Sequence, residues 1–345
     1  MFIRKEMRVI NTPKKVLLIQ TAFIGDVVLI TPLIQEIINK YPSVLLDVIV
    51  VPECVKILEN NPNINNIYSF DKRKMSILSF LKFIKMLGSK RYDMSFSPHS
   101  SFRSGLISFL SRIPIRIGFK RNFQQLFLTN KIKHPSNIHK RLKNIALLGI
   151  SDFKQHSYAT KLYPSTDNYL KVSDLMSKLS KSQKTIIVAP GSVWYTKMWP
   201  LENYIELVNR LLEIAYNVVL IGSKNEKYLS DRIMESVKNE NKQNLLSVIG
   251  DFDILDSAAL IEKSDLVICN DSGALHIANA TKTPVYAIFG PTTKDMGYFP
   301  FNENDMVFEV DIYCRPCGRH GGKICPEKHF KCMRMITVDV ILNHL

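Results

Sequence analysis

A single carboxylate follows the first apolar segment of the chain. In LLIQTAFIGDVVLITPLI, residues 17–34, a strand is predicted to end at Gln20, and Asp26 comes directly after Gly25. A carboxylate held at the carboxyl end of a strand suits a general base that takes a proton from a substrate hydroxyl. The competing interpretation is a helix-capping or first-turn acid that the helix dipole stabilises.

A second stretch combines hydroxyl groups with one lysine. In APGSVWYTKMWP, residues 189–200, a predicted strand ends and a loop leads to the next helix. Ser192, Thr196 and Lys197 would offer hydroxyl donors and a positive charge to a diphosphate. The alternative is that Trp199 packs in the core and Lys197 is solvated.

A third stretch resembles an anion site at a helix start. In CNDSGALHIANATKTPVYAIFGPT, residues 269–292, a strand delivers Asp271, and Ser272 and Gly273 open a helix. Free backbone N–H groups at such a start bind anions, and glycine permits close approach. His276, one turn on, would face the same ligand. The alternative is a capping Asp271 or Ser272 with His276 in the core.

Four of the six cysteines lie close together in CRPCGRHGGKICPEKHFKC, residues 314–332. Cys314 and Cys317 form a C-x2-C pair, and Cys325 and Cys332 follow it. A zinc site is one interpretation, with His320 and His329 as competing ligands. Reduced packing cysteines or a redox-dependent link are the other, and each would be a stability element. Cys54 and Cys269 lie in apolar contexts and are expected to be buried.

Strands alternate with helices on both sides of a polar linker at residues 151–168. This alternation predicts parallel sheets covered by helices, in two Rossmann-like halves that face each other across a cleft, with ligands beyond the carboxyl ends of strands. The expected strands are 16–20, 45–51, 92–96, 115–119, 185–189, 218–222, 245–249, 266–269 and 284–289. The expected helices run from the first loop to about residue 40, then 76–88, 139–148, 169–179, 201–214, 226–239, 254–263 and 272–281.

The charge is uneven along the chain. Residues 1–165 hold 26 Lys/Arg against 9 Asp/Glu, whereas residues 166–345 hold 20 against 22. Residues 101–150 contain ten basic residues and no acid. Such a field attracts polyanions, among them nucleic acid, an anionic membrane face or a phosphorylated substrate, although a solvated lysine-rich surface explains it as well. No nucleic-acid-binding motif is present. The first residues lack a secretory signal, and no apolar run reaches the ~18 residues of a membrane span, which predicts a cytoplasmic protein.

Together, GDVVLITPLI, PGSVWYTKMWP, NDSGALHIANATKTPVYAIFGPT and the C-terminal CRPC…CP…CM resemble the ADP-heptose:lipopolysaccharide heptosyltransferases of glycosyltransferase family 9, most of all the heptosyltransferase II branch. The matches span residues 16–335. Two departures stand out: Met198 lies where relatives often carry arginine, and Ala274 where many have proline.

The resemblance implies a GT-B fold with an acceptor-binding domain at 1–163 and a nucleotide-sugar-binding domain at 164–345. It implies an inverting transferase without catalytic metal or cofactor that moves heptose from ADP-heptose to the lipid A-core acceptor of lipopolysaccharide. Asp26 resembles the general base, and Lys197 is expected to assist catalysis. The residues expected to bind the donor are Ser192, Thr196, Glu226, Asp271, Ser272, Gly273 and His276.

The basic N-terminal half would meet the anionic acceptor and, transiently, the cytoplasmic face of the inner membrane, with no role for nucleic acid. The residues expected at that face are Arg103, Arg112, Arg116, Lys120 and Arg121. Three alternatives remain: a family 9 transferase with another nucleotide sugar and surface glycan, a non-catalytic relative that binds nucleotide or anionic lipid, and a nucleic-acid binder, which would show steep salt dependence.

Overall fold

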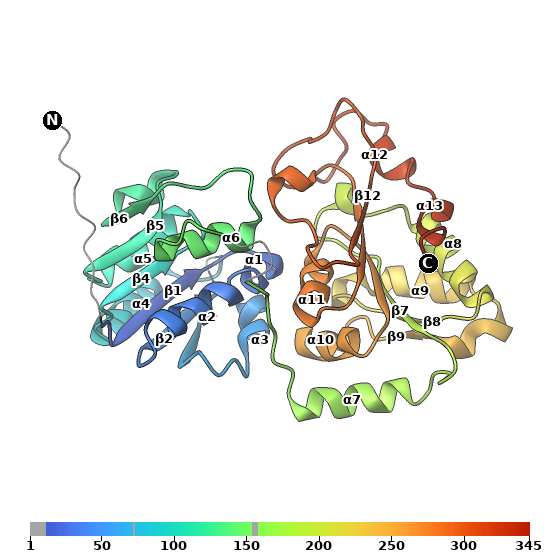
Figure 1. Ribbon diagram of the computed structural model, residues 1–345, viewed down its shortest axis with the longest axis horizontal. Helices are drawn as coiled ribbons and strands as arrows, with labels where there is room; N and C mark the ends of the chain where they lie inside the picture. Colours follow the sequence, from blue (N-terminus) through green and yellow to red (C-terminus); the bar gives the residue numbers. More distant parts are fainter. Residues whose placement is uncertain (1–11, 72, 154–157) are drawn as a thin grey trace. The chain divides into compact units, whose positions relative to one another are not determined.

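The computed structural model describes residues 12–71, 73–153 and 158–345. The expectation that the first residues carry no secretory signal concerns mainly residues outside these ranges. The chain divides into two compact units, Met1–Lys161 and Leu162–Leu345 (Figure 1). Each unit is built on one six-stranded sheet in which every neighbouring pair of strands is parallel. The expected α/β class, with two Rossmann-like halves, is confirmed.

The N-terminal sheet has the strand order β3-β2-β1-β4-β5-β6. Its strands are β1 (Lys15–Gln20), β2 (Leu45–Val50), β3 (Asn66–Ser69), β4 (Met94–Ser97), β5 (Ile115–Phe119) and β6 (Asn130–Ile132). The helices of this unit are α1 (Ile24–Val28), α2 (Thr31–Lys40), α3 (Val55–Leu58), α4 (Ile77–Ser89), α5 (Phe102–Leu110) and α6 (Lys140–Ile145).

The C-terminal sheet repeats this plan in the order β9-β8-β7-β10-β11-β12. Its strands are β7 (Thr185–Ala189), β8 (Asn217–Leu220), β9 (Leu245–Ser247), β10 (Leu266–Asn270), β11 (Val285–Phe289) and β12 (Met306–Glu309). Its helices are α7 (Thr166–Met176), α8 (Leu201–Glu213), α9 (Lys227–Ser236), α10 (Ile254–Glu262), α11 (Gly273–Thr281), α12 (Lys331–Arg334) and α13 (Val338–Leu342).

Both sheets follow the order of a dinucleotide-binding fold, and this order locates the ligand crevices. The winding reverses between β1 and β4 in one unit and between β7 and β10 in the other. At such a switch point the loops after the two strands diverge and leave a crevice at their carboxyl ends. Asp26 follows β1, Lys197 follows β7 and Asp271 follows β10. The stretches that carry Asp26, Lys197 and Asp271 therefore lie at the switch points of their own units, whereas the cysteine-rich stretch follows the edge strand β12.

The central strands are apolar because helices cover both of their faces. All residues of β7, β10 and β11 are buried. In the N-terminal unit, Leu17 and Ile19 of β1 pack with Ile84 and Leu87 of α4 and with Ile107 of α5. Continuous Val, Ile and Leu runs of this kind are typical of parallel sheets, which is why the sequence reveals these strands.

The structure differs from the sequence-based elements where the chain is short or irregular. The expected helix after β1 is broken into α1 and α2 at Leu29 and Ile30. The Thr31 hydroxyl donates to the Val28 carbonyl there, and Pro32 has no N–H to continue the first helix. The strands β3, β6 and β12 and the helices α3, α5, α12 and α13 were not predicted, because segments this short give too little periodicity.

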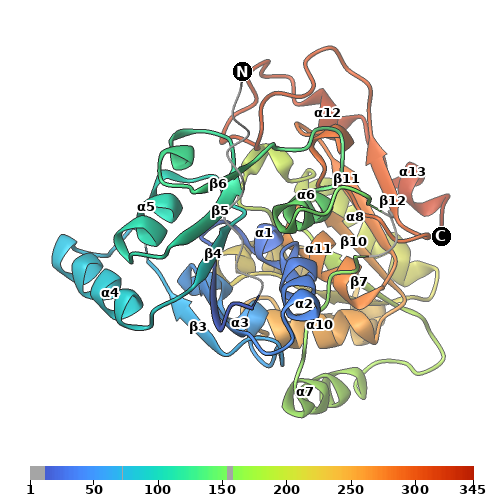
Figure 2. The same ribbon diagram turned by 60° about the vertical axis from the view of Figure 1, so that its left-hand side comes forward.

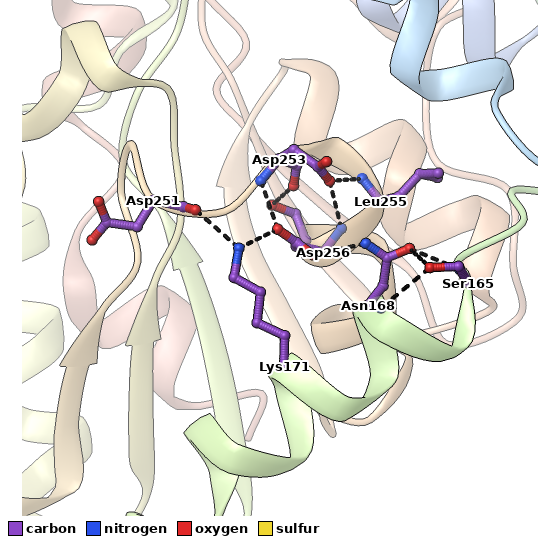
Figure 3. A network of polar contacts seen from close by, with 8 residues as sticks. Ser165, Asn168, Lys171, Asp251, Asp253, Leu255 and Asp256 are labelled. Carbon is purple, nitrogen blue, oxygen red and sulfur yellow. Dashed lines mark hydrogen bonds and ion pairs between the residues drawn. The ribbon is translucent and has the colours of Figure 1, made fainter.

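Helix α7 opens the C-terminal unit and is fastened to α10 by a polar network (Figure 3). Asn168 Nδ2 donates to Asp256 Oδ1 at 2.7 Å, and Lys171 Nζ lies 2.5 Å from Asp256 Oδ2. Asp253 caps α10 by accepting from the backbone N–H groups of Leu255 and Asp256. Burial raises the pKa of Asp256, but the bonds from Lys171 and Asn168 outweigh it and leave that pKa below its usual value. The carboxylate is therefore held ionised at this junction.

Candidate functional site

A buried ion pair joins two loops at the switch point of the C-terminal unit. Lys197 Nζ lies 2.5 Å from Asp271 Oδ2, and the side chains are only 12% and 7% exposed. The Thr292 hydroxyl, which follows β11, donates to the same Asp271 oxygen at 2.6 Å. An ammonium has three N–H donors, and the ion pair with Asp271 uses one, so it fixes Lys197 while other N–H groups can serve an anion. The alternative of a solvated Lys197 is wrong.

Asn270, which the sequence analysis passed over, holds the lysine loop in place. Its side chain is fully buried at the end of β10. Asn270 Nδ2 donates to the carbonyls of Pro190 and Gly191 at 2.9 and 3.1 Å, and Oδ1 accepts from the Trp199 N–H at 2.9 Å. Both ends of the loop that carries Lys197 are thus tied to one side chain. A buried amide at the end of an apolar strand, directly before Asp271, is the signal that sequence reasoning missed.

The start of α11 presents backbone N–H groups next to this ion pair. Ser272 is the N-cap, and its side chain makes no capping hydrogen bond, so the capping alternative is wrong for Ser272. Gly273 opens the helix. His276 is 4% exposed and its ring centre lies 6.2 Å from that of Tyr298. The start of α11 therefore keeps its backbone N–H groups for an anion. His276, in contrast, is buried against Tyr298, which agrees with the interpretation of His276 as a core residue.

Glu226 lies between the loops that follow β7 and β8. It accepts from the Ser223 N–H and hydroxyl at 2.6 and 2.8 Å in a capping box just before α9. A Cβ placed on Gly191 would meet Glu226 Oε1 at 1.9 Å. The carboxylate therefore fills the space that the side-chain-free Gly191 leaves, and it reaches the same loop as Ser192.

Thr196 is turned toward the C-terminal segment. Its N–H donates to the Gly322 carbonyl at 3.0 Å, and its hydroxyl oxygen accepts from the Gly322 N–H at 2.7 Å. The rings of Trp194 and His320 stack at 6.2 Å beside this pair. Thr196 is buried, so its main part in the structure is to fasten the lysine loop to the cysteine-rich segment.

The cysteine-rich segment carries free thiols. Cys54 and Cys269 are buried as expected, and burial, followed by the charge of Glu53, raises the pKa of Cys54 to about 12. Cys317 Sγ donates to the Cys314 carbonyl at 3.2 Å, and Cys332 is buried. Within the described residues no three Cys, His, Asp or Glu side chains are arranged to hold a metal ion. Of the four clustered cysteines only Cys332 is buried, while Cys314 and Cys325 are partly exposed and Cys317 is exposed.

In the N-terminal unit, Asp26 lies in the first turn of α1, directly after the loop that follows β1. The N-cap is Phe23, so Asp26 is a first-turn acid and not a capping residue. Its side chain is partly exposed, which a proton acceptor requires. Thr21 and His99 meet at this switch point, with 3.3 Å between Thr21 Oγ1 and His99 Nδ1. Asp26 therefore lies at the crevice that the strand order predicts for this unit.

The structure brings Lys197 and Asp271 into contact and places Glu226 against the loop that carries Ser192. Ser192 itself accepts from the Trp194 N–H at 3.3 Å, which shapes the loop. Thr292 and Asn270 were not among the residues expected at the site. Spacing in the sequence does not reveal them, because the residues that they contact lie far away along the chain. An anion held at the start of α11 would meet donors from three strand ends of the C-terminal sheet.

Known proteins with sequences similar to this chain are named as lipopolysaccharide heptosyltransferases. Lipopolysaccharide heptosyltransferase 2 of Escherichia coli K12 is 26% identical over 296 residues, which cover 81% of this chain and 84% of the relative. Lipopolysaccharide core heptosyltransferase OpsX of Haemophilus influenzae Rd is 28% identical over 326 residues, which cover 91% and 88%.

Solved structures share the two-unit fold. E. coli ADP-heptose LPS heptosyltransferase II gives a TM-score of 0.80 at 24% identity over 96% of this chain and 97% of that one. The family 9 glycosyl transferase of Veillonella parvula gives 0.81 at 20% identity over 97% and 96%. The fold is therefore GT-B. Residues 80–329 match the family described as glycosyltransferase family 9 (heptosyltransferase), and the chain belongs to this family of enzymes.

Proposed function

We propose that this glycosyltransferase transfers heptose from ADP-heptose to the inner core of lipopolysaccharide with inversion at the anomeric carbon. The family assignment and the lipopolysaccharide heptosyltransferase names of the relatives support the substrates. The observation that carries the proposal is the Lys197–Asp271–Thr292 network beside the free N–H groups of α11, because it suits a diphosphate leaving group.

The reaction needs one proton acceptor and one diphosphate site. Asp26 takes the proton of an acceptor hydroxyl as its oxygen bonds to the anomeric carbon. The bond from that carbon to the diphosphate oxygen breaks, and ADP leaves with the electron pair. Negative charge grows on the diphosphate, so preorganised donors there lower the barrier. Removal of one such donor costs about 3 kcal/mol, or roughly a hundredfold in rate.

The donors assigned to the diphosphate are Lys197, Ser192 and the backbone N–H groups from Ser272 and Gly273. Asp271 positions Lys197, and Thr196 anchors the loop. Glu226 completes the donor site toward the ribose, whereas His276, which is buried against Tyr298, is given no donor contact in this proposal. In this proposal the N-terminal domain, residues 1–163, binds the acceptor and the C-terminal domain, residues 164–345, binds the nucleotide sugar.

The decisive experiment incubates the protein with ADP-heptose and defined truncated lipopolysaccharides and follows the products by mass spectrometry. We expect acceptor-dependent ADP release and a gain of one heptose. Asp26→Asn should lower kcat by about 10²–10⁴-fold, while Glu36→Gln, on α2 of the same unit, serves as the matched carboxylate control. Transfer only from another nucleotide sugar, or nucleotide binding without turnover, would contradict the heptose assignment.

We further propose that the N-terminal unit docks on an anionic membrane at the cytoplasmic face. No helix among the described residues is long and apolar enough to cross a bilayer. Apolar side chains are nevertheless exposed on α4, on α5, which contacts α4 (Figure 2), and on the 3₁₀ turn 123–126, which contacts α5. These residues are Ile77, Leu78, Leu81, Phe102, Phe109, Leu110, Phe123 and Leu126.

The charge around this surface selects an anionic bilayer as its partner. Residues 101–150 contain no acid, Arg103 lies in the first turn of α5, and Arg112 lies two residues after the end of that helix. Apolar insertion combined with basic residues is how peripheral proteins bind such membranes. Arg116 differs from the other expected residues, because its guanidinium donates to the carbonyls of Phe127 and Ile113 and so serves the fold.

Vesicle flotation tests the docking surface. Phe123 and Leu126 are 73% and 70% exposed, so Phe123→Ser/Leu126→Ser should fold normally and lose binding to phosphatidylglycerol vesicles. Leu170→Ser, at a residue 64% exposed on α7 of the other unit, is the matched control. Equal binding by the double variant and wild type would overturn this assignment, as would equal binding to neutral phosphatidylcholine vesicles.

A further inference from the structure

The segment that follows β12 returns to the ion pair of the C-terminal unit. The described residues 310–330 connect β12 to α12 in turns and bends (Figure 1). Within this segment, residues 315–322, which we call the strap, make contacts at both ends. Arg315 lies beside the loop that follows β11, and Gly321 lies against the loop that carries Lys197. Both loops belong to the diphosphate site of the proposed function, so the strap borders that site.

A buried guanidinium anchors the start of the strap. The Arg315 side chain is 5% exposed. Its Nη2 donates to the Thr292 carbonyl at 2.7 Å and lies 2.8 Å from Glu309 Oε2. Its Nε and Nη1 donate to further backbone carbonyls in the loops after β11 and β12. Because the Thr292 hydroxyl donates to Asp271, Arg315 joins the strap to the carboxylate that holds Lys197.

The end of the strap packs on the stem of Lys197. A Cβ placed on Gly321 would lie 2.6 Å from Trp194 Cβ and 2.9 Å from Lys197 Cγ, so this close approach requires glycine. The next residue, Gly322, donates its N–H to the Thr196 hydroxyl at 2.7 Å. The backbone of the strap therefore lies directly on the residue whose ammonium is assigned to the diphosphate.

The charged side chains already placed at this site do not by themselves favour a diphosphate. Lys197 Nζ lies 2.5 Å from Asp271 Oδ2, so the two charges largely cancel. Glu226 adds a carboxylate that reaches the same loop, and Met198, which follows Lys197, is uncharged. The backbone N–H groups at the start of α11 contribute only partial charge. A diphosphate brings several negative charges, so the site needs a further cation.

Other cations near the strand ends of this sheet are engaged. Arg315 is bound to Glu309 and to backbone carbonyls, as described above. Lys294, in the loop after β11, lies 3.5 Å from Glu309 Oε1. Lys224, in the loop after β8, packs its stem against Gly250, which follows the edge strand β9. None of these three cations is available to a ligand between β7 and β10.

Arg319, within the strap, differs from these cations. It is exposed, and among the residues that the structure describes it takes part in no ion pair. It lies two residues before Gly321, and two residues of chain span at most about 7 Å, so its backbone stays within that distance of the glycine that touches Lys197. A guanidinium suits a diphosphate, because its planar N–H groups bind two oxygens at once.

We propose that Arg319, carried by the strap, binds the diphosphate of the sugar nucleotide together with Lys197 and the start of α11. The inference rests on the proposed function and deepens it by naming a donor-binding residue from the segment after β12. Arg315 and Gly321 are positioning residues in this arrangement, since they hold the strap against the two loops. As the bond from the anomeric carbon to the diphosphate oxygen breaks, the guanidinium stabilises the charge that develops on the leaving ADP.

Binding of three probes separates a diphosphate contact from a structural role. ADP, inorganic pyrophosphate and adenosine are titrated by calorimetry into wild type, Arg319→Met and Arg319→Lys, with Arg334→Met, at an exposed arginine of α12, as the matched control. We expect Arg319→Met to bind ADP and pyrophosphate about tenfold more weakly and adenosine as tightly as wild type does. Arg319→Lys keeps the charge and should recover part of the loss, and Arg334→Met should match wild type.

Two results of these titrations would overturn the inference. One is an Arg319→Met variant that binds ADP and pyrophosphate as tightly as wild type. The other is an Arg319→Met variant that loses adenosine affinity as much as ADP affinity, because a contact to the diphosphate leaves the nucleoside unaffected.

Turnover separates this inference from the proposed function. Wild type that shows the expected dependence of ADP and pyrophosphate binding on Arg319, but transfers no heptose, would contradict the function and leave the diphosphate contact intact. Wild type that transfers heptose, while Arg319→Met keeps both its ADP Kd and its kcat, would overturn the contact alone.

Discussion

Lys197 and Asp271 are 74 residues apart in sequence, yet their charged atoms lie 2.5 Å apart beyond the ends of β7 and β10. The pair is largely buried, so the mutual attraction is strong and its loss is costly. It also ties the loop that carries Ser192 to the strand end that opens α11. This ion pair, together with the hydrogen bonds of Asn270 and Thr196, therefore holds the diphosphate site of the proposed reaction in place.

Breaking this ion pair should destabilise the protein. Lys197→Met leaves an uncompensated buried carboxylate, and we expect the free energy of unfolding to fall by about 3–5 kcal/mol. Lys197→Met/Asp271→Leu should lose less than the sum of the single changes, with a coupling of about 0.5–3 kcal/mol in a urea double-mutant cycle. The exposed pair Lys178–Asp174 is the control and should couple by less than about 1 kcal/mol. Additive changes at 197 and 271 would contradict the buried pair.

Gly191 should not tolerate a methyl group while Glu226 is present. Because a Cβ at Gly191 would lie 1.9 Å from Glu226 Oε1, Gly191→Ala forces the carboxylate to move. We expect a loss of about 1–3 kcal/mol in unfolding free energy, and little further loss when Gly191→Ala is added to Glu226→Ala.

Gly88→Ala is the matched control for that substitution. Gly88 lies inside α4, and its nearest neighbour would be the Ser111 carbonyl oxygen at 3.7 Å, an ordinary contact. Alanine there should be neutral or stabilising by about 0.5–1 kcal/mol. Equal destabilisation at both glycines would show that Glu226 is not the cause.

Asn270→Ala should loosen the lysine loop. The change leaves the Trp199 N–H and the carbonyls of Pro190 and Gly191 without their partner. Each unsatisfied buried group costs about 1–3 kcal/mol, so the urea midpoint should fall clearly. ADP affinity, measured by calorimetry on the folded variant, should fall as well. Asn209→Ala, at an amide that bonds within α8 and to Ser236, is the control and should leave ADP affinity unchanged.

His134 should make stability depend on pH. Burial, followed by the charges of Arg121, Lys140 and Lys143, lowers its folded-state pKa from 6.5 to about 4. The unfolded chain therefore binds this proton first, so the contribution is fully present above about pH 6.5 and is lost as the pH falls toward about 4. The difference in urea midpoint between wild type and His134→Gln should change across this window. A constant difference would contradict a neutral His134.

Much of the site was visible in the sequence because chemistry-bearing residues follow apolar strands. The Val, Ile and Leu runs of β1, β7 and β10 mark buried parallel strands, and residues directly after them must lie at the carboxyl edge of a sheet. Asp26, Lys197 and Asp271 were found in this way, and so was the fold class. The short strands β3, β6 and β12 escaped, since their pairing partners, and not their own patterns, define them.

Only the tertiary structure decided which of those residues meet. Local periodicity places a residue on an element, but hydrogen bonds and ion pairs join side chains from loops far apart in sequence. The structure alone therefore revealed Asn270 and Thr292 as partners of the lysine loop and of Asp271, and it turned Thr196 toward Gly322. It also set α6 against the turn after α1, through the bond from Asn144 to the Leu29 carbonyl.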